Sequence, residues 1–176
     1  TGQLQQITTF LGAVPGRRAV IVGAEHVSMS AVLTLRSHGC QVAAMVTEAS
    51  AHESHPLLVL ATLRRTRVPL LTSRRVARII GRERVESVEL DDGSTLECDT
   101  VVFTGDWIGE HEVARAAGIE LDPTRRAVAV DSTFRTSRDR TFAIGNLVHP
   151  ARASGTCAID GRRLARHLAS AVGAAR

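Results

Sequence analysis

The segment of residues 18–48 constrains the fold of this chain more than any other part of the sequence. Residues 18–23 contain a β-branched run and end in glycine, which is typical of a strand buried on both faces of a parallel sheet. Apolar residues then recur at helical spacing over residues 27–38, and Gly39 provides a helix stop. A second apolar run, residues 41–48, completes a βαβ unit. The sequence therefore predicts an α/β fold built on a Rossmann-like parallel sheet.

The middle of the chain predicts a second helix and several short strands. Pro56 marks the helix start, because proline is favoured at the first helical position. The strand-like pieces after this helix are residues 68–72, 76–80 and 85–90. The last piece alternates apolar and charged residues before a turn signal at residues 91–94, so we expect a small antiparallel meander against the parallel sheet. Residues 100–105 again have the pattern of a buried strand, followed by a short helix over residues 112–117.

The composition changes at Asp122-Pro123, where we place a domain boundary. Two further strands are expected at residues 127–131 and 141–145, and a long helix at about residues 156–172 closes the chain. The predicted domains are residues 12–122, a Rossmann-like NAD(P)-binding domain, and residues 123–176.

Composition excludes several classes of partner. All 22 basic residues are arginine, scattered mostly as pairs, and aromatic residues make up only 3% of the chain. Nucleic-acid binders usually combine a concentrated basic stripe with aromatics or a known motif, so we expect no nucleic-acid partner. The net charge of +4 still favours the attraction of anionic cofactors. Apolar residues come in short runs, so we expect no membrane-spanning segment.

The N-terminus and the cysteines indicate the setting of the protein. The first residues lack the charged and apolar regions of a signal peptide, and no initiator Met is present. We therefore expect a cytoplasmic protein with a processed or excised N-terminus. Cys40, Cys98 and Cys157 are widely separated and form no Cys-x-x-Cys, which argues against a disulfide framework or a zinc site. Each is expected to be a small buried apolar residue, and no metal ligands are predicted.

A dinucleotide-binding fingerprint is expected at the turn after residue 22, where backbone N–H groups and a helix N-terminus can hold a pyrophosphate. The sequence there is Gly23, Ala24, Glu25, His26, Val27 and Ser28. Only the first glycine of G-x-G-x-x-G is kept. Glu25 stands where backbone should approach phosphate, and Ser28 replaces the glycine of close helix packing. The turn predicts either nucleotide binding or a Rossmann unit retained as a scaffold.

Three further residues are candidates beside this turn and near the C-terminus. Glu48 ends the second strand at close to the spacing at which an acid binds both ribose hydroxyls of NAD, which favours NAD over NADP. A glutamate at a strand end is also common on any exposed loop. His26 and His149 lie beside the proposed cofactor loops and are candidates for positioning a cofactor or moving a proton, whereas the other histidines have the pattern of solvated residues.

Residues 136–146 resemble a segment of the FAD-dependent pyridine nucleotide-disulfide oxidoreductase family, with Thr-Ser, a short gap and then Phe-Ala-x-Gly-Asp. Residues 100–105 resemble the family's apolar strand ending in Thr-Gly, and the βαβ unit resembles its NAD(P)H domain. Residues 145–150, with Trp107, are similar to a subgroup of FAD-dependent subunits related to amino-acid, opine and sarcosine oxidation. The resemblance covers nearly the whole chain and implies that its last part completes a discontinuous FAD-binding domain.

The resemblance also implies roles for particular residues. Gly145 would let the chain pass close to the ribityl-phosphate part of FAD, and Asn146, where the family has Asp, would accept a hydrogen bond from a ribityl hydroxyl. A helix beginning near Thr156 would direct its positive end at the flavin pyrimidine ring. Thr104-Gly105 would lie at the cofactor end of its strand. Cys157, at the helix start, is either an activated or a buried structural thiol.

The family's flavin domain opens with an N-terminal βαβ unit, and none precedes Thr1. We therefore expect either an excerpt of a longer protein or a partner subunit that supplies the FAD-binding half. The implied function is hydride transfer between NAD(P)H or a small organic substrate and flavin, with no catalytic side chain identified. The alternatives are a non-catalytic scaffold or subunit-assembly module with a degenerate nucleotide site, and an NAD-sensing module without flavin.

Overall fold

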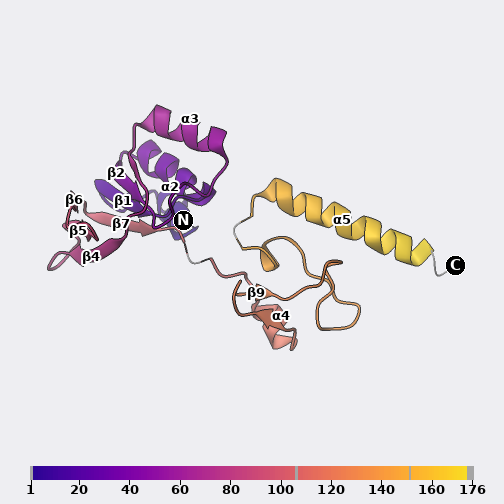
Figure 1. The fold of residues 1–176 in the computed structure, drawn as a ribbon. Coiled ribbons are helices and arrows are strands. Elements are labelled where there is room, and N and C mark those ends of the chain that lie inside the picture. Colours follow the sequence, from indigo (N-terminus) through magenta and orange to yellow (C-terminus); the bar gives the residue numbers. More distant parts are fainter. Residues whose placement is uncertain (1, 106, 151, 174–176) are drawn as a thin grey trace. The chain divides into compact units, whose positions relative to one another are not determined.

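The computed structural model describes residues 2–105, 107–150 and 152–173, with side chains described up to residue 170. The chain divides into two compact units, Thr1–Gly105 and Asp106–Arg176 (Figure 1). The boundary expected near Asp122 therefore falls inside the second unit, because Asp122 pairs with Ala127 in a hairpin. Residues 107–122 belong to the same unit as the C-terminal part of the chain, and the predicted division between cofactor domains stays a prediction.

A four-stranded parallel sheet forms the centre of the first unit, in the order β3-β2-β1-β7. The strands are β1 (Arg18–Val22), β2 (Gln41–Val46), β3 (Leu70–Leu71) and β7 (Thr100–Phe103). β1 pairs in parallel with both β2 and β7, which confirms the predicted βαβ unit and a sheet strand within residues 100–105. The burial expected of that strand is wrong, because β7 is only half-buried and Phe103 is 60% exposed. Residues 68–72 were expected in the meander. Instead, β3 extends the parallel sheet, because Leu70 and Leu71 pair with Met45 and Val46.

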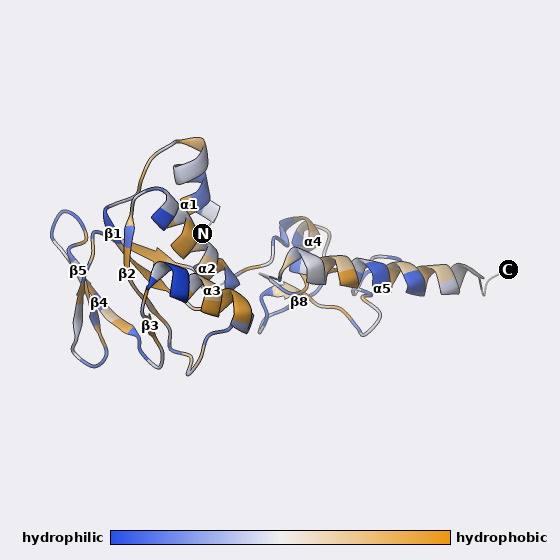
Figure 2. Cartoon of the chain, turned by 90° about the horizontal axis from the view of Figure 1, so that it is seen from above, coloured by the Kyte–Doolittle hydropathy of each residue, from blue (hydrophilic) through white to orange (hydrophobic). Residues whose placement is uncertain are grey.

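Helices cover one face of this sheet (Figure 1). They are α1 (Gly2–Gln5), the π-helix η1 (Gln6–Phe10), α2 (His26–Ser37) and α3 (Pro56–Thr66). Ile21 and Met45 on the sheet pack against Met29, Val32 and Leu35 of α2, all of which are buried. Apolar residues accordingly gather in the middle of the unit (Figure 2). The two N-terminal helices have no counterpart in the predicted elements.

The antiparallel meander packs on the other face of the sheet. It consists of β4 (Val76–Ile80), β5 (Ser87–Leu90) and β6 (Thr95–Glu97), and β6 was not expected. Val88 and Leu90 pack on Val20 and Val46, all buried. The β1–β2 register shifts between Ala19 and Val20, which breaks the strict alternation of side chains along β2. The first unit thus has three layers, with helices, parallel sheet and meander in that order.

The second unit is small and has little sheet. It contains α4 (Glu112–Ala116), the β8–β9 hairpin (Leu121–Asp122 and Ala127–Val128), the 3-10 helix η2 (Gly145–Leu147) and α5 (Ser154–Gly173). Val128, Ala143 and Val148 form its core. The strand expected at residues 141–145 does not form. Only an isolated bridge between Arg135 and Phe142 forms there, next to backbone hydrogen bonds from the Thr136 N–H to the Thr141 carbonyl oxygen and from the Ala143 N–H to the Phe134 carbonyl oxygen.

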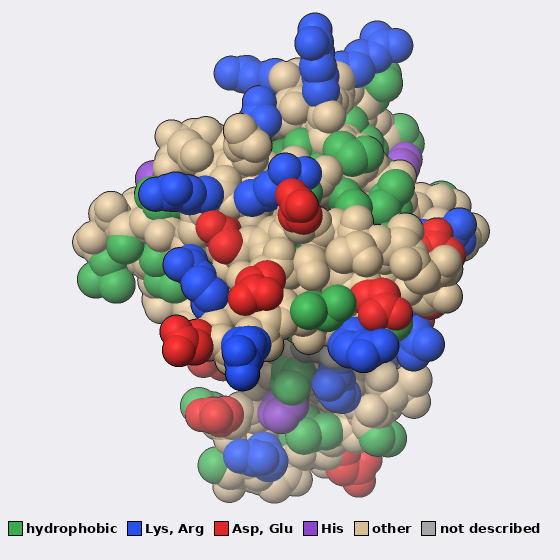
Figure 3. Space-filling model, turned by 90° about the vertical axis from the view of Figure 1, so that its left-hand side faces the viewer, with side chains coloured by type: hydrophobic (Ala, Val, Ile, Leu, Met, Phe, Trp, Pro, Cys, Tyr) green, Lys and Arg blue, Asp and Glu red, His purple; other side chains and the backbone are tan. Residues whose placement is uncertain are grey.

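Charges are mixed on the face of the molecule drawn in Figure 3, where arginine and acidic side chains are interspersed. Arg74 pairs with Asp92 at 2.8 Å beside the meander. Within the described residues, no helix has both the length and the apolar character needed to cross a membrane. No three His, Cys, Asp or Glu side chains in this described part come together as a set that would hold a metal ion.

Candidate functional site

The turn between β1 and α2 lies at the carboxyl edge of the parallel sheet, where ligands bind in open α/β folds. Its first residue, Gly23, has a φ of +132°, which side chains rarely adopt. A Cβ atom at this position would collide with the Thr104 hydroxyl, just after β7. The Gly23 N–H donates to the Val46 carbonyl oxygen at 2.8 Å, which ties the turn to the end of β2. The fold therefore requires the one glycine that remains of the fingerprint.

Ser28 and Thr104 form a buried hydrogen bond that joins α2 to the end of β7. Their hydroxyl oxygens lie 2.7 Å apart. The Thr104 hydroxyl donates to the Val22 carbonyl oxygen at 2.9 Å, so Ser28 is the donor to Thr104. Thr104 was expected to contact a cofactor, but its side chain is only 1% exposed and is committed to bonds within the fold. A hydroxyl thus occupies the position where the fingerprint has its last glycine.

The Glu25 side chain folds back over the turn instead of pointing to solvent. One carboxylate oxygen, Oε2, lies 2.7 Å from the place that a Cβ atom would take at Gly23. The other, Oε1, is buried and has no hydrogen-bond partner among the described residues. The Glu25 backbone is the N-cap of α2, and its carbonyl oxygen accepts from the N–H groups of Ser28 and Met29 at 3.0 and 3.3 Å. The carboxylate therefore lies where the fingerprint brings backbone close to phosphate.

A second glutamate, which sequence reasoning missed, lies along the same turn. The Glu53 N–H donates to the Ala24 carbonyl oxygen at 3.1 Å, and Glu25 and Glu53 form an isolated parallel bridge. Ala24 is fully buried, so only its backbone is available to a ligand. His26 is the half-buried first residue of α2. Glu53 lies far from the fingerprint in sequence and has no motif of its own, so no sequence signal pointed to it.

Glu48 lies two residues beyond the end of β2 and is exposed. The residue before it is held firmly, because the Thr47 N–H donates to the Leu71 carbonyl oxygen and the Thr47 carbonyl oxygen accepts from the Arg74 N–H. Glu48 thus has the place in the fold that its spacing predicted. Its role toward a ribose stays a prediction.

In the second unit, Gly145 lies against Cys157 of α5. Gly145 has a φ of +64°, and a Cβ atom there would lie 3.4 Å from the Cys157 Cβ atom. The exposed Asn146 uses its amide oxygen within the chain, accepting from the Arg152 N–H at 3.0 Å and from the Cys157 thiol at 3.6 Å. That oxygen was expected to face a ribityl hydroxyl. Because the carbonyl lone pairs are engaged, the amide NH₂ is the group that remains for a ligand.

The start of α5 differs slightly from the expectation. The helix begins at Ser154, and the Thr156 N–H donates to the Ala153 carbonyl oxygen at 2.9 Å, so Thr156 lies inside the first turn. Cys157 is half-buried, whereas Cys40 and Cys98 are buried as predicted. Burial raises the pKa of the Cys40 and Cys98 thiols, which is expected of structural cysteines.

An ion pair and a histidine lie near the start of α5. The Arg152 guanidinium is 3.4 Å from the carboxylate of Asp160, a residue that is only 3% exposed. His149 is half-buried, and its pKa is lowered by burial first and then by the positive charges of Arg152 and Arg125. The neutral imidazole is therefore favoured. The proton-transfer role considered for His149 stays a prediction.

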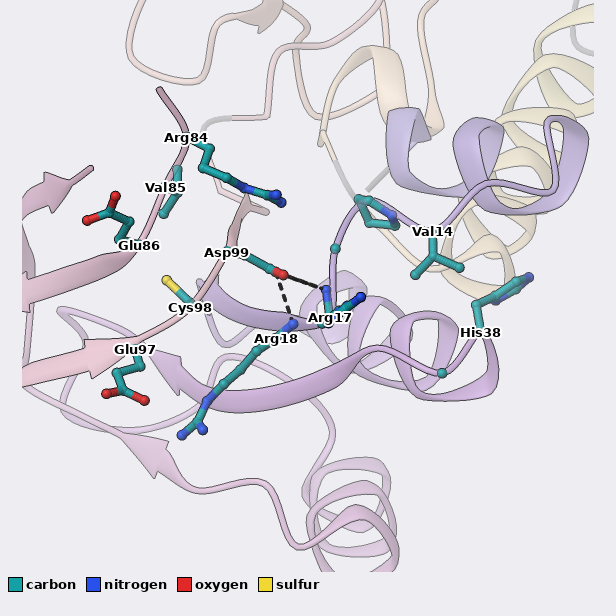
Figure 4. A pocket seen from close by; sticks show the side chains of 13 residues that line it. Val14, Arg17, Arg18, His38, Arg84, Val85, Glu86, Glu97, Cys98 and Asp99 are labelled. Atoms are coloured by element: carbon teal, nitrogen blue, oxygen red, sulfur yellow. Dashed lines mark hydrogen bonds between the residues drawn. The ribbon is translucent and has the colours of Figure 1, made fainter. Parts of the chain in front are cut away.

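A large open cavity of about 990 Å³ lies at the other edge of the sheet, by the amino ends of β1 and β7 (Figure 4). Its walls carry Arg17, Arg18 and Arg84 together with Glu86 and Asp99. The Asp99 carboxylate accepts hydrogen bonds from backbone N–H groups of Arg17 and Arg18 and so holds the wall together. Charges of both signs nearly balance here, and ligands of open α/β sheets bind at the carboxyl edge. We therefore place the candidate site at the Gly23 turn.

The first unit has the architecture of a Rossmann-type dinucleotide-binding domain. The chain matches the pyridine nucleotide-disulphide oxidoreductase family over residues 4–174 and belongs to that family. A ferredoxin–NADP reductase of Saccharopolyspora erythraea is 32% identical to it over 142 residues, which are 78% of this chain and 42% of the relative.

Solved structures show the same fold. Thioredoxin reductase from T. acidophilum has a TM-score of 0.71 at 20% identity, covering 89% of this chain and 53% of that one. An FAD-dependent pyridine nucleotide-disulphide oxidoreductase from Desulfovibrio vulgaris has a TM-score of 0.67 at 25% identity, over 96% and 46% of the two chains. The chain spans about half the length of these proteins. None of the three is named as an amino-acid or sarcosine oxidase, so the subgroup related to amino-acid, opine and sarcosine oxidation gains no support from them.

The two cofactors of such a family fit this chain unequally. For FAD, Gly145 with its positive φ, the exposed Asn146 and the first turn of α5 lie together, which is the arrangement that the family resemblance implies for a flavin contact. For the pyrophosphate of NAD(P)H, the carboxylate of Glu25 occupies the approach to the turn. Two unit charges 4 Å apart interact by about 4 kcal/mol at an effective dielectric constant near 20, so this carboxylate opposes a phosphate.

Proposed function

We propose that this chain is part of an FAD-dependent oxidoreductase that transfers hydride between flavin and NAD(P)H or a small organic substrate. Membership of the pyridine nucleotide-disulphide oxidoreductase family over residues 4–174 is the observation that carries the proposal. Gly145, Asn146 and the start of α5 would contact the flavin, which supplies the redox chemistry when bound. The donor loses one hydride, which is two electrons and a proton, and the flavin receives it.

The protein's own residues contribute position and electrostatics. The positive end of α5 would stabilise the negative charge that reduction places on the flavin ring. The other half of the FAD site would come from a segment outside these residues or from a partner subunit, in a cytoplasmic setting. The preference for NAD over NADP rests on Glu48 alone.

Absorption spectroscopy of the protein that carries this segment together with its FAD-binding half tests the proposal. We expect bound flavin, and we expect the Asn146→Asp variant to retain it, because one carboxylate oxygen keeps the acceptor for the Arg152 N–H and the second oxygen, in place of the NH₂, would accept from a ribityl hydroxyl. Asn146→Leu should lose flavin while its melting temperature stays within a few degrees. A protein free of flavin would refute the proposal.

The second candidate function is a scaffold without nucleotide. The Glu25 carboxylate at the turn favours it, because this carboxylate disfavours a pyrophosphate. Absence of both flavin and nucleotide binding from the intact protein would support this scaffold function, whereas flavin that a substrate reduces would exclude it.

A further inference from the structure

The phosphate turn, residues Gly23 to Ser28, already contains an anion of its own. The Glu25 carboxylate lies over Gly23, with Oε2 close to the backbone that a pyrophosphate would approach and Oε1 buried without a partner among the described residues. It also lies at the N-terminus of the twelve-residue helix α2, where the helix dipole favours a negative charge. The side chain thus takes the electrostatic place that a ligand phosphate has in this fold.

The space for a phosphate is reduced as well. The buried Ser28–Thr104 hydrogen bond fills the position of the fingerprint's last glycine and draws α2 onto the end of β7. The Glu53 backbone is bonded to the Ala24 carbonyl oxygen, which places a second acidic residue along the turn. An entering pyrophosphate would have to displace an anion attached to the turn itself.

The arginines nearest in the fold to the carboxyl edge of the sheet lie outside the phosphate turn. Among residues of the neighbouring loop after β3, Arg74 is paired with Asp92 at 2.8 Å and Arg75 lies beside it. The residues of the phosphate turn itself carry one carboxylate and one histidine, His26. The phosphate turn therefore contains no arginine or lysine that would offset the charge of Glu25.

We propose that Glu25 is an intramolecular plug of the phosphate turn, which excludes the pyrophosphate of dinucleotides from this Rossmann unit. The consequence of this inference rests on the proposed function. If the turn excludes NAD(P)H, the small organic substrate is the molecule that exchanges hydride with the flavin. Glu48 has no ribose to bind in that case, and its exposure is that of an ordinary loop residue.

Calorimetric titration of the 176-residue chain tests the plug, with NADH, ADP and adenosine as probes. The variants are Glu25→Gln, which keeps the shape and removes the charge, and Glu25→Gly, which removes both. We expect no saturation of the unaltered chain at millimolar NADH or ADP. Both variants should bind NADH and ADP at least tenfold more tightly, and neither should gain affinity for adenosine, which has no phosphate.

Glu97→Gln is the matched control. Glu97 is exposed on β6, at the wall of the cavity by the opposite edge of the sheet, so this change removes the same charge away from the turn. It should leave binding of all three probes unchanged. The Glu25→Gln variant should also melt at a lower temperature than the unaltered chain, because α2 loses the anion at its N-terminus, and added ADP should restore part of the difference.

Two results would overturn the inference. One is micromolar binding of NADH by the unaltered chain. The other is that neither Glu25→Gln nor Glu25→Gly gains affinity for ADP although circular dichroism shows that both variants are folded. The flavin spectrum of the intact protein is a separate measurement. Tight NADH binding together with bound flavin would refute the plug and support the proposed function. Absence of flavin together with a Glu25-dependent block of ADP binding would refute the proposed function and support the plug.

Discussion

Replacing Asp99 by alanine should destabilise the first unit, because its carboxylate joins the amino ends of β1 and β7. The Arg17 N–H donates to both carboxylate oxygens, at 3.0 and 2.8 Å, and the Arg18 N–H donates to Oδ1 at 3.0 Å. The Thr100 hydroxyl also donates to Oδ1, at 3.1 Å. This one side chain thus holds two strands together across 82 residues of sequence.

The magnitude follows from the bonds lost. Hydrogen bonds to a charged group contribute about 1.5–3 kcal/mol each when buried. Asp99 is half-exposed, so water can partly replace the lost carboxylate as acceptor for the N–H groups of Arg17 and Arg18. The lower end of that range therefore applies to each of the two N–H groups. We therefore expect Asp99→Ala to lower the free energy of unfolding by about 2–3 kcal/mol. Asp99→Asn, which keeps one acceptor oxygen without the charge, should cost about half as much.

The loss should depend on pH in a defined direction. Burial acts to raise the pKa of Asp99, but hydrogen bonds from the N–H groups of Arg18 and Arg17 and from the Thr100 hydroxyl outweigh it, and the pKa is lowered. A carboxyl whose folded-state pKa lies below its unfolded value of about 3.9 stabilises the fold fully above that value. Its contribution is lost as the pH falls through the folded-state pKa.

Urea unfolding followed by circular dichroism at pH 7 and pH 3 measures both effects. The difference between the unaltered chain and Asp99→Ala should be full at pH 7 and smaller at pH 3. Glu97→Ala, an exposed change on β6, is the control and should stay within about 0.5 kcal/mol at both pH values. A difference below about 0.5 kcal/mol for Asp99→Ala at pH 7 would falsify the reasoning.

Three further predictions concern the candidate sites. Gly23→Ala should lower the free energy of unfolding by more than about 2 kcal/mol in urea titration, because a side chain at a φ of +132° is strained and meets Thr104; an unchanged midpoint would contradict this. Arg152→Ala should destabilise the second unit by about 1–2 kcal/mol in thermal melts, because it leaves the buried Asp160 carboxylate without its guanidinium partner. The Arg152 side chain is 39% exposed, so it contributes less than a buried partner would. An equal loss of stability in Arg152→Lys would argue against the charge as the cause. His149 has a lowered pKa in the fold, so its contribution to the free energy of unfolding is present above its unfolded pKa of about 6.5 and declines as the pH falls through the folded-state value. His149→Asn should abolish that decline in thermal melts between pH 7.5 and 5. An identical pH profile in both proteins would contradict this prediction.

Local patterns were sufficient for the βαβ unit of residues 18–46. The β-branched run of residues 18–22, the helical spacing of residues 27–37 and the apolar run of residues 41–46 all appear where they were predicted, because each records burial of its own side chains. The patterns were insufficient at residues 68–72 and 141–145. There the choice between sheet, meander and bridge depended on partners: Leu70 and Leu71 pair with β2, and Phe142 forms only an isolated bridge with Arg135.

The sequence by itself determined the βαβ unit, the glycine at the start of the phosphate turn and the family of the chain. Only the tertiary structure decided what the turn can accept. Thr104 meets Gly23 and Ser28 from 76 or more residues away, and Glu53 reaches the turn through a backbone bond that no motif encodes. Glu25 was a visible departure from the fingerprint, but the direction of its carboxylate was not visible. That direction belongs to the carboxyl edge of the sheet, where β1, β2 and β7 end and α2 begins.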